Sequence, residues 1–169
     1  DAVSLRFATA YGWSEKPRFD LVVNNMIGDA HFKKNITIHG GDQWRPLVHV
    51  RDIVRAIGMV IRAKDIAHRV YNIGSAGQNF QIRDLAQKIV EHFSGVSLNI
   101  EETNTDPRSY RVDFSRAEKE LGFRPQHSIS DAVAEFRDAF ARGHIQNMND
   151  DEYYRVKYLK NNLVPSLKI

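Results

Sequence analysis

The stretch GGDQWRPLVHVRDIVRAI, residues 40–57, contains side chains that are well suited to chemistry. Arg45 stands between a glycine-rich turn and an apolar strand. A guanidinium group is permanently charged and presents a planar fork of donors, a geometry that suits phosphate oxygens. In a purely structural alternative, Arg45 stacks on the neighbouring Trp44. The first question is therefore what Arg45 is positioned to hold.

His49 and Asp52 follow in the same stretch, and a histidine beside a carboxylate suggests acid–base chemistry. His49, however, lies inside a predicted strand, and Asp52 lies at a predicted helix start, where a carboxylate caps free amides. We therefore favour structural roles for both. The other histidines show no spacing typical of metal ligands, and we assign no metal site. They are His31, His39, His68, His92, His127 and His144.

Tyr153 and Lys157 form a Tyr-x-x-x-Lys pair, and their spacing would put both side chains on one helix face. A pair with this spacing readily arises by chance in a chain with 6 tyrosines. We interpret it as a surface pair without a catalytic role.

The composition is that of a folded domain, with 169 residues, of which 42% are hydrophobic and 27% charged. The 24 basic residues are scattered among 21 acidic ones, which argues against a nucleic-acid partner despite the net charge of +3. No apolar run is long enough to span a membrane. The first residues lack the features of a signal peptide, and the chain has no cysteine. These features favour a cytoplasmic protein.

Apolar periodicity predicts strands that alternate with helices. A buried strand is expected over residues 3–12, and a helix whose apolar residues include Ile53, Ile57, Val60 and Ile61 over 51–63. Ser115 and Glu118 have the spacing of a reciprocal helix cap, and Gly122 is expected to end that helix. The remaining helices are expected over 20–34, over 82–93, from 131 and from 149, and the remaining strands at 35–41, 47–50, 69–75 and 96–102. This order predicts an α/β fold with a mainly parallel sheet, in which function gathers where strands end.

Several segments, in this order, resemble the second half of the extended short-chain dehydrogenases, the family of nucleotide-sugar epimerases and dehydratases. They are LRFATAYG, RFDLVVNN, ITIHGGDQWRPLVHVRDIVRAI, VYNIGS, DPRSYRVDFSRAEKELGF and SISDAVAEF. The resemblance covers residues 2–142, and within the family it is greatest to bacterial epimerases of polysaccharide biosynthesis. It implies the last strands of a Rossmann-type parallel sheet plus a smaller carboxyl-terminal substrate-binding subdomain.

The resemblance also implies a division of the chain. Residues 1–74 would form the distal part of the NAD-binding domain, with a substrate-binding segment interleaved at about 18–46. Residues 75–145 would form the substrate-binding subdomain, and residues 146–169 a terminal helix or tail.

In this family a glycine-rich turn and a catalytic Tyr-x-x-x-Lys pair precede the strand that begins here at Val3. No G-x-x-G-x-x-G occurs in the sequence. We therefore expect a carboxyl-terminal fragment that has no catalytic residue and does not bind NAD alone. Its partner would be the missing amino-terminal half, and the parent enzyme could form a homodimer.

The resemblance assigns roles to individual residues. Arg45 would hold the diphosphate of a nucleoside-diphosphate sugar, and Arg108 would be a second nucleotide-contacting arginine. Thr9 stands where the family commonly has an asparagine that contacts the sugar or its diphosphate. The acidic ribose contact expected a few residues after Arg108 is missing, because Arg111 occupies that region.

Two further groups of residues are assigned in the same way. Leu21 and Asn24 lie on the helix that approaches the nucleotide in the family, although Asn24 could equally be a buried amide that bonds to backbone. Phe7 and Ala8 fall near the nicotinamide, although apolar strand residues are by default core residues.

These expectations lead to one main hypothesis for function. The chain would be the substrate-binding half of an NAD-dependent epimerase or dehydratase that acts on a nucleoside-diphosphate sugar. The alternative is a non-catalytic binding or regulatory protein that keeps part of the same fold.

Overall fold

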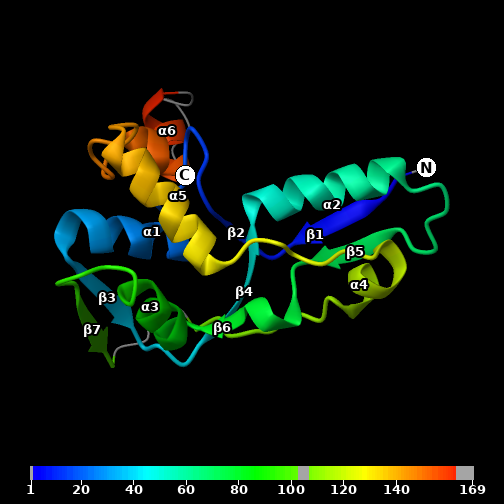
Figure 1. Cartoon of the computed structure of the whole chain (residues 1–169), viewed down its shortest axis with the longest axis horizontal. Helices are drawn as coiled ribbons and strands as arrows, with labels where there is room; N and C mark the ends of the chain where they lie inside the picture. The colour runs from blue at the N-terminus through cyan, green and yellow to red at the C-terminus, as the bar shows by residue number, and fades with distance from the viewer. Residues whose placement is uncertain (1, 103–106, 163–169) are drawn as a thin grey trace.

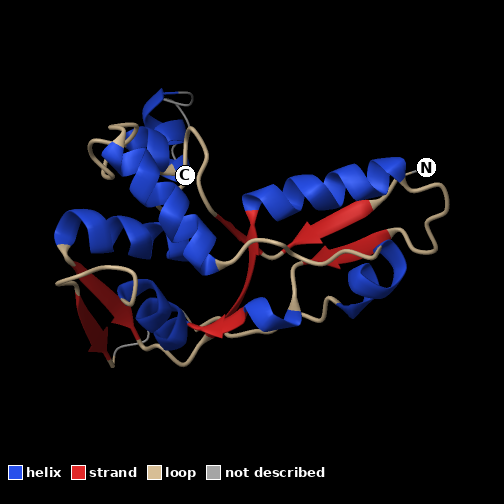
Figure 2. Cartoon of the chain, in the orientation of Figure 1, coloured by secondary structure: helices blue, strands red, loops and turns tan. Residues whose placement is uncertain are grey.

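The computed structural model describes residues 2–102 and 107–162 and shows an α/β fold (Figure 1, Figure 2). The strands are β1 (Ser4–Phe7), β2 (Thr9–Tyr11), β3 (Asn35–His39), β4 (Trp44–His49), β5 (Val70–Ile73), β6 (Asn79–Gln81) and β7 (Ser97–Glu101). The α-helices are α1 (Val22–Gly28), α2 (Val50–Arg62), α3 (Ile82–Val90), α4 (Ser115–Leu121), α5 (Ile129–Ala141) and α6 (Arg155–Asn162). Shorter helices are η1 (Asp29–Lys33, a π-helix), η2 (Ala76–Gln78) and η3 (Asp151–Tyr153).

Parallel pairing dominates, as the sequence predicts. β1 pairs with β5, β2 with β4 and β3 with β7, all in parallel, and only the β4–β6 pair among these described strands is antiparallel. The strand expected over residues 3–12 is divided at Ala8, so that β1 and β2 belong to different sheets. The expectation that this strand is buried is wrong for β1, where the Phe7 side chain is 44% exposed.

β4 links the sheets because it changes partner along its length. Residues 44–46 pair with β6, and residues 47–49 pair with β2. Pro46 has no N–H to donate, and it stands in the half of the strand where only one neighbour is paired. A proline that would disrupt a central strand is therefore tolerated here.

The apolar side chains form two cores. One lies between α1, α3 and α5 and includes Tyr11, Ile36 and Phe136. The other lies between the β1–β5 pair, α2 and α4, and includes Tyr71 and Phe123. Figure 1 shows these groups of elements on opposite sides of β4, which passes between them.

α2 begins and ends within one residue of the predicted helix, but part of the predicted buried face is wrong. Ile57 is 39% exposed and Ile61 is 77% exposed, while Ile53 and Val60 are partly buried. Val54, at 68%, extends the exposed stripe. Within the described chain, the β1–β5 sheet that packs with α2 has only two strands, and these exposed side chains lie outside its core.

Of the two signals predicted for the ends of α4, the one at its carboxyl end is confirmed and the one at its amino end is wrong. Gly122 ends α4 in the left-handed conformation (φ 65°), as predicted. The reciprocal cap between Ser115 and Glu118 is wrong: no side chain caps α4 at its first position, and the Ser115 N–H instead donates to Asp113. The capping box is found at α5, between Ser128 and Asp131.

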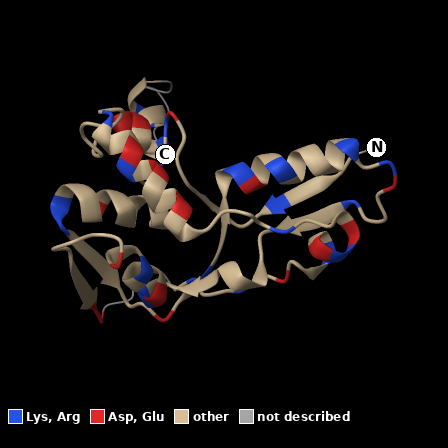
Figure 3. Cartoon of the chain, viewed as in Figure 1, with Lys and Arg blue, Asp and Glu red and all other residues tan. Residues whose placement is uncertain are grey.

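Residues 20–34 are helical from Val22, but the helix changes to the π form η1 at Asp29 and ends at Lys34. Basic and acidic residues are interspersed along the ribbon of the described chain, and neither kind is confined to one group of elements (Figure 3). Among the described residues, no helix is both long and apolar enough to cross a membrane.

Candidate functional site

A cavity of about 460 Å³ opens where β2, β4 and the start of α1 meet two segments from the second half of the chain. It brings together the sequence candidates Thr9, Leu21, Arg45 and Arg108, which come from widely separated segments. The full lining is Thr9, Phe19, Asp20, Leu21, Val22, Asn25, Arg45, Arg108, Tyr110 and Tyr154. A volume of this size lies within the range of small-molecule sites.

The Arg45 side chain is largely buried, with 9% of its surface exposed. Its Nη1 donates to the Trp44 carbonyl at 2.8 Å and also to the Arg108 carbonyl. The guanidinium carbon lies 5.7 Å from the centre of the Tyr110 ring. In the alternative considered from the sequence, Arg45 would stack on Trp44, but the cation over the Trp44 ring is Arg111, at 4.9 Å.

Arg108 belongs to a segment without regular secondary structure, and β4 holds this segment through polar contacts. The Tyr110 N–H donates to the Trp44 carbonyl at 3.3 Å, and the Trp44 N–H donates to the Ser109 hydroxyl at 3.1 Å. Together with the bond from Arg45 to the Arg108 carbonyl, these contacts hold the chain from Arg108 to Tyr110 against β4. The Arg108 side chain itself is exposed toward the cavity.

The other candidates are placed differently. Asn24 does not line the cavity: it is 3% exposed, and its Oδ1 accepts from the Gly12 N–H at 3.0 Å, so that the structural alternative holds for this residue. Asn25, one residue later, faces the cavity instead. Phe7 ends β1 with an exposed ring, and Ala8 is buried in the second core, so neither joins this site.

Six lining residues were not among the sequence candidates. Besides Asn25, those with polar groups are Asp20, Tyr110 and Tyr154, and the other two are Phe19 and Val22. Asp20 forms a two-pronged ion pair with Arg18, at 2.9 and 2.8 Å. Burial raises the pKa of the Tyr154 phenol, so this hydroxyl stays protonated at neutral pH and can donate a hydrogen bond. Tyr110 follows Arg108 closely in DPRSY, and that proximity was the one usable sequence signal.

His49 and Asp52 lie in a buried polar cluster beside this cavity rather than in it. Both side chains have no exposed surface. His49 Nδ1 accepts from the Arg51 N–H and so caps α2, whereas Asp52 accepts from the backbone of Gln126 and His127. The expectation that Asp52 caps its own helix is therefore wrong, because its partners belong to the loop before α5.

The cluster extends to α5 through Glu135. His49 Nε2 lies 3.2 Å from Glu135 Oε2 but is not aligned for a hydrogen bond, and the His49 ring stacks on His127 at 4.8 Å. Glu135 also forms an ion pair with Arg51 at 3.0 Å and accepts a hydrogen bond from the Trp13 N–H at 3.3 Å. These contacts join β2, α2 and α5, which indicates a structural role.

Tyr153 and Lys157 do not share a helix face. Tyr153 lies in η3, is 5% exposed and packs edge-on against Phe19. Lys157 lies in α6 and pairs with Asp151 at 2.5 Å. The expectation of a surface pair is thus wrong for the tyrosine, which is a core residue.

One pair of glycines has a spacing that occurs in the turns that bind a dinucleotide pyrophosphate. Gly74 and Gly77 are spaced like part of a glycine-rich turn, but they lead into η2 and the strand β6 rather than into a long helix. A Cβ added at Gly74 would approach the Phe114 ring to 2.6 Å, so this glycine is required for packing. Among residues 2–102 and 107–162, no three metal-binding side chains gather either.

Comparison with known proteins confirms the resemblance. Residues 1–74 match the model of the family described as NAD dependent epimerase/dehydratase family. Among curated relatives, UDP-glucuronic acid decarboxylase 2 of Arabidopsis thaliana is 30% identical over 64% of this chain and 24% of its own length. The dTDP-glucose 4,6-dehydratase of Streptomyces griseus is 36% identical over 64% of this chain and 33% of its own length.

Solved structures give the same result for the fold. MoeE5 in complex with UDP-glucuronic acid and NAD superposes with a TM-score of 0.66, at 26% identity, over 82% of this chain and 46% of that one. UDP-glucose 4-epimerase of Thermotoga maritima with UDP-glucose gives a TM-score of 0.66, at 26% identity, over 80% and 46%. The chain thus spans less than half the length of these relatives.

Proposed function

From the chain's relationship to the NAD-dependent epimerases and dehydratases, we propose that it supplies the nucleotide-sugar-binding part of such an enzyme. The observation that carries this proposal is the cavity that brings Arg45 and Arg108 together with Thr9 and Leu21. The solved relatives MoeE5 and the Thermotoga maritima epimerase hold UDP-glucuronic acid and UDP-glucose, respectively. We infer a substrate of the same class, a nucleoside-diphosphate sugar.

In this proposal Arg45 and Arg108 bind the diphosphate. The two arginines line one cavity, and the backbone of one is held by the side chain of the other. An arginine presents five N–H donors on a planar, permanently charged group, and this geometry suits phosphate oxygens. Burial of Arg45 strengthens such a contact, because water screens it less.

The remaining lining residues would orient the two ends of the substrate. Tyr110 and Tyr154 present aromatic rings and hydroxyl groups suited to a base or a sugar. Thr9, at the start of β2, offers one hydroxyl that can donate and accept. NAD, bound by another part of the enzyme, would supply the hydride chemistry, while these residues bind and orient the sugar nucleotide.

The test measures binding of UDP-glucose to the full-length protein by calorimetry, for variants that separate binding from folding. Arg108→Ala removes an exposed side chain but leaves the carbonyl that Arg45 uses. A charged hydrogen bond contributes roughly 1.5–3 kcal/mol, so this variant should bind about 10- to 150-fold more weakly with an unchanged Tm. Arg111→Ala, which removes a nearby cation that does not line the cavity, is the matched control and should bind normally.

Arg45 should behave differently because it also holds the Arg108 segment. Arg45→Ala should weaken UDP-glucose binding and lower the Tm together, and Arg45→Lys should restore only part of the binding. In the double variant Arg45→Ala/Arg108→Ala, the loss of UDP-glucose binding free energy should differ from the sum of the two single losses by at least about 0.5 kcal/mol. The affinity for NAD should barely change. Normal UDP-glucose binding by both Arg108→Ala and Arg45→Lys would refute the diphosphate assignment.

A further inference from the structure

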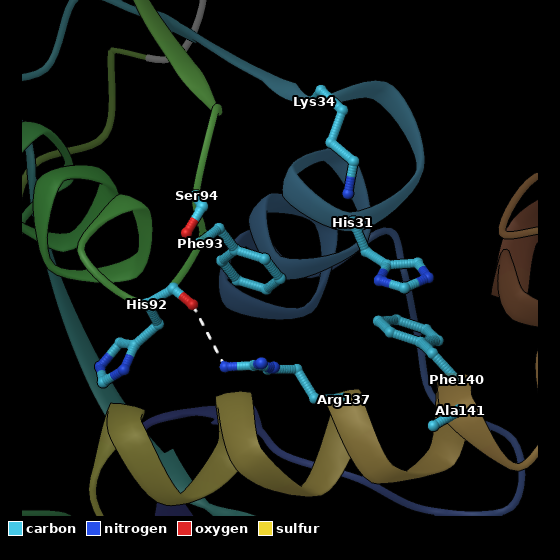
Figure 4. Close-up of a pocket in the computed structure, with 8 residues that line it drawn as sticks. All are labelled: His31, Lys34, His92, Phe93, Ser94, Arg137, Phe140 and Ala141. Atoms are coloured by element: carbon cyan, nitrogen blue, oxygen red, sulfur yellow. Dashed lines mark hydrogen bonds between the residues drawn. The ribbon is translucent and has the colours of Figure 1, made fainter.

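A second cavity, of about 390 Å³, lies between the end of η1, the end of α3 and α5 (Figure 4). It shares no lining residue with the candidate substrate cavity. Its lining is His31, Lys34, His92, Phe93, Ser94, Arg137, Phe140 and Ala141, which includes no acidic side chain.

The two permanent cations of this cavity differ from their neighbours. Lys33 pairs with Asp29 at 2.7 Å, and Arg142 pairs with Asp138 at 3.0 Å. Lys34 and Arg137, by contrast, have no carboxylate within ion-pair distance among residues 2–102 and 107–162. Cations that face one cavity without a counterion create a positive potential there, and the potential attracts an anion.

Arg137 is held in place for such a role. Its Nη1 donates to the His92 carbonyl at 3.3 Å, and its guanidinium lies 6.0 Å from the centre of the Phe93 ring. Figure 4 shows the guanidinium between α5 and the His92 carbonyl, while the Lys34 ammonium approaches from the opposite side of the cavity. The positions of both charges are consistent with a shared anionic group between them.

Lys34 occupies its position at a conformational cost. It closes η1 with a φ of 55°, and it is the only residue other than glycine with a positive φ in the described chain. Glycine or asparagine is the usual choice for a left-handed helix end. The backbone conformation therefore does not account for a lysine at this position. A role for its cationic side chain in the cavity does account for it.

Flat rings form one wall of the cavity. The His31 ring stacks on Phe140, with 4.3 Å between centroids and 25° between planes. Burial, followed by the charges of Lys34 and Arg137, lowers the pKa of His31, so its ring is neutral at pH 7 and presents a flat surface. His92, which also lines the cavity, is held by a 3.0 Å hydrogen bond between its Nε2 and the Ser130 hydroxyl.

We propose that this cavity binds a small phosphate monoester that carries a flat ring, with the phosphate between Lys34 and Arg137 and the ring against His31. An arginine and a lysine on two sides match the oxygens of a phosphate, and the stacked wall matches a planar group. The proposal does not depend on the function assigned to the first cavity.

The probe is phenyl phosphate, titrated calorimetrically into the full-length protein. We expect saturable binding with a Kd of about 1 mM or tighter. Arg137→Ala and Lys34→Gly should each weaken it at least about 10-fold, since each removes a charged contact. Arg137→Lys should recover part of the loss. Arg108→Ala, in the other cavity, should leave it unchanged.

Lys33→Ala and Arg142→Ala are the matched controls, because each removes one positive charge from the same region but from an existing ion pair. They should bind phenyl phosphate as the parent protein does. His31→Ala should weaken phenyl phosphate but not inorganic phosphate, because it removes part of the ring wall. Three results would overturn the proposal: no binding at 10-fold above the expected Kd, equal losses in the control variants, or equal affinities for inorganic and phenyl phosphate.

Discussion

Asp52→Asn tests whether the buried cluster beside the substrate cavity holds α2 and α5 together. The Asp52 carboxylate accepts from the Gln126 N–H at 2.9 Å, from the His127 N–H at 2.9 Å and from Arg55 at 2.7 Å. Burial raises its pKa, but these donors outweigh that effect and bring the pKa below its ordinary value. The group is therefore a carboxylate at neutral pH.

The expected magnitude follows from the donors. Each carboxylate oxygen of Asp52 accepts from at least one buried donor. In either orientation of an asparagine side chain, its NH₂ group would replace one of these oxygens, so that at least one donor would lose its acceptor. The remaining hydrogen bonds would be made to a neutral oxygen instead of a charged one. A buried donor left unsatisfied costs about 1–3 kcal/mol, and the loss of charge assistance costs roughly 1 kcal/mol more for each remaining bond. Asp52→Asn should therefore lower the free energy of unfolding by about 3 kcal/mol. For a chain of this size, that is about 6–12 °C in Tm.

The assay is urea unfolding of the full-length protein, followed by circular dichroism. Asp138→Asn is the control: it makes the same chemical change in an exposed i, i+4 ion pair and should cost less than about 0.5 kcal/mol. The effects of Arg55→Ala and Asp52→Asn on the free energy of unfolding should be non-additive, because the two side chains share a hydrogen bond. A loss below about 1 kcal/mol for Asp52→Asn would refute the role assigned to the cluster.

Four further outcomes can be checked. Burial lowers the pKa of His49, so the unfolded chain takes up a proton first as the pH falls. Stability should therefore decline below about pH 6.5, and more shallowly in His49→Gln, as urea titrations at several pH values would show. Gly12→Ala should cost at least about 2 kcal/mol in the same assay, because φ is 111° and an added Cβ would collide with the His49 ring. Ser128→Ala should cost about 1 kcal/mol through loss of the α5 cap, measured by thermal unfolding. Tyr153→Phe should leave kcat of the proposed enzyme, measured on the full-length protein, within about threefold, because Tyr153 packs in the core. A loss of orders of magnitude would contradict that placement.

The sequence was sufficient for the class of fold because its signals are local. Apolar periodicity gave α2 and α3 close to their observed starts, and Gly122 marked the end of α4. Strand boundaries were less accurate. The short strand β6 was missed, since NFQ has three residues and is recognisable as a strand only through its antiparallel pairing with β4.

Errors about burial have a different origin. The spacing of Ile57 and Ile61 shows that α2 has an apolar face, but not how much surface is available to cover it. For Asp52 and Tyr153, the decisive partners are distant in sequence: Gln126 lies 74 residues from Asp52, and Tyr153 packs against Phe19. Residue type and spacing cannot reveal contacts of this range.

The sequence predicted the two arginines of the candidate cavity but not its tyrosines. Arg45 and Arg108 were identified through motifs, whereas Tyr154 lies beyond the segments that resemble the family. Its place beside Leu21 and Thr9 follows from the packing of η3 against Phe19, which no local pattern encodes.

The wall of the cavity that carries Arg108 depends on polar bonds rather than on a core. The 107–112 segment is joined to β4 by the Arg45 and Trp44 bonds, and to β6 by Asn79, which accepts from the Val112 N–H at 3.0 Å and donates to its carbonyl at 3.2 Å. Exposed side chains on such a segment can change without disturbing either core. Arg45 cannot, because it is buried and bonds to the segment itself. We therefore expect substitutions at position 110 to alter which nucleotide sugar binds. Arg108→Ala should weaken binding of all nucleoside-diphosphate sugars at an unchanged Tm, whereas Arg45→Ala should weaken binding of all of them and lower the Tm as well.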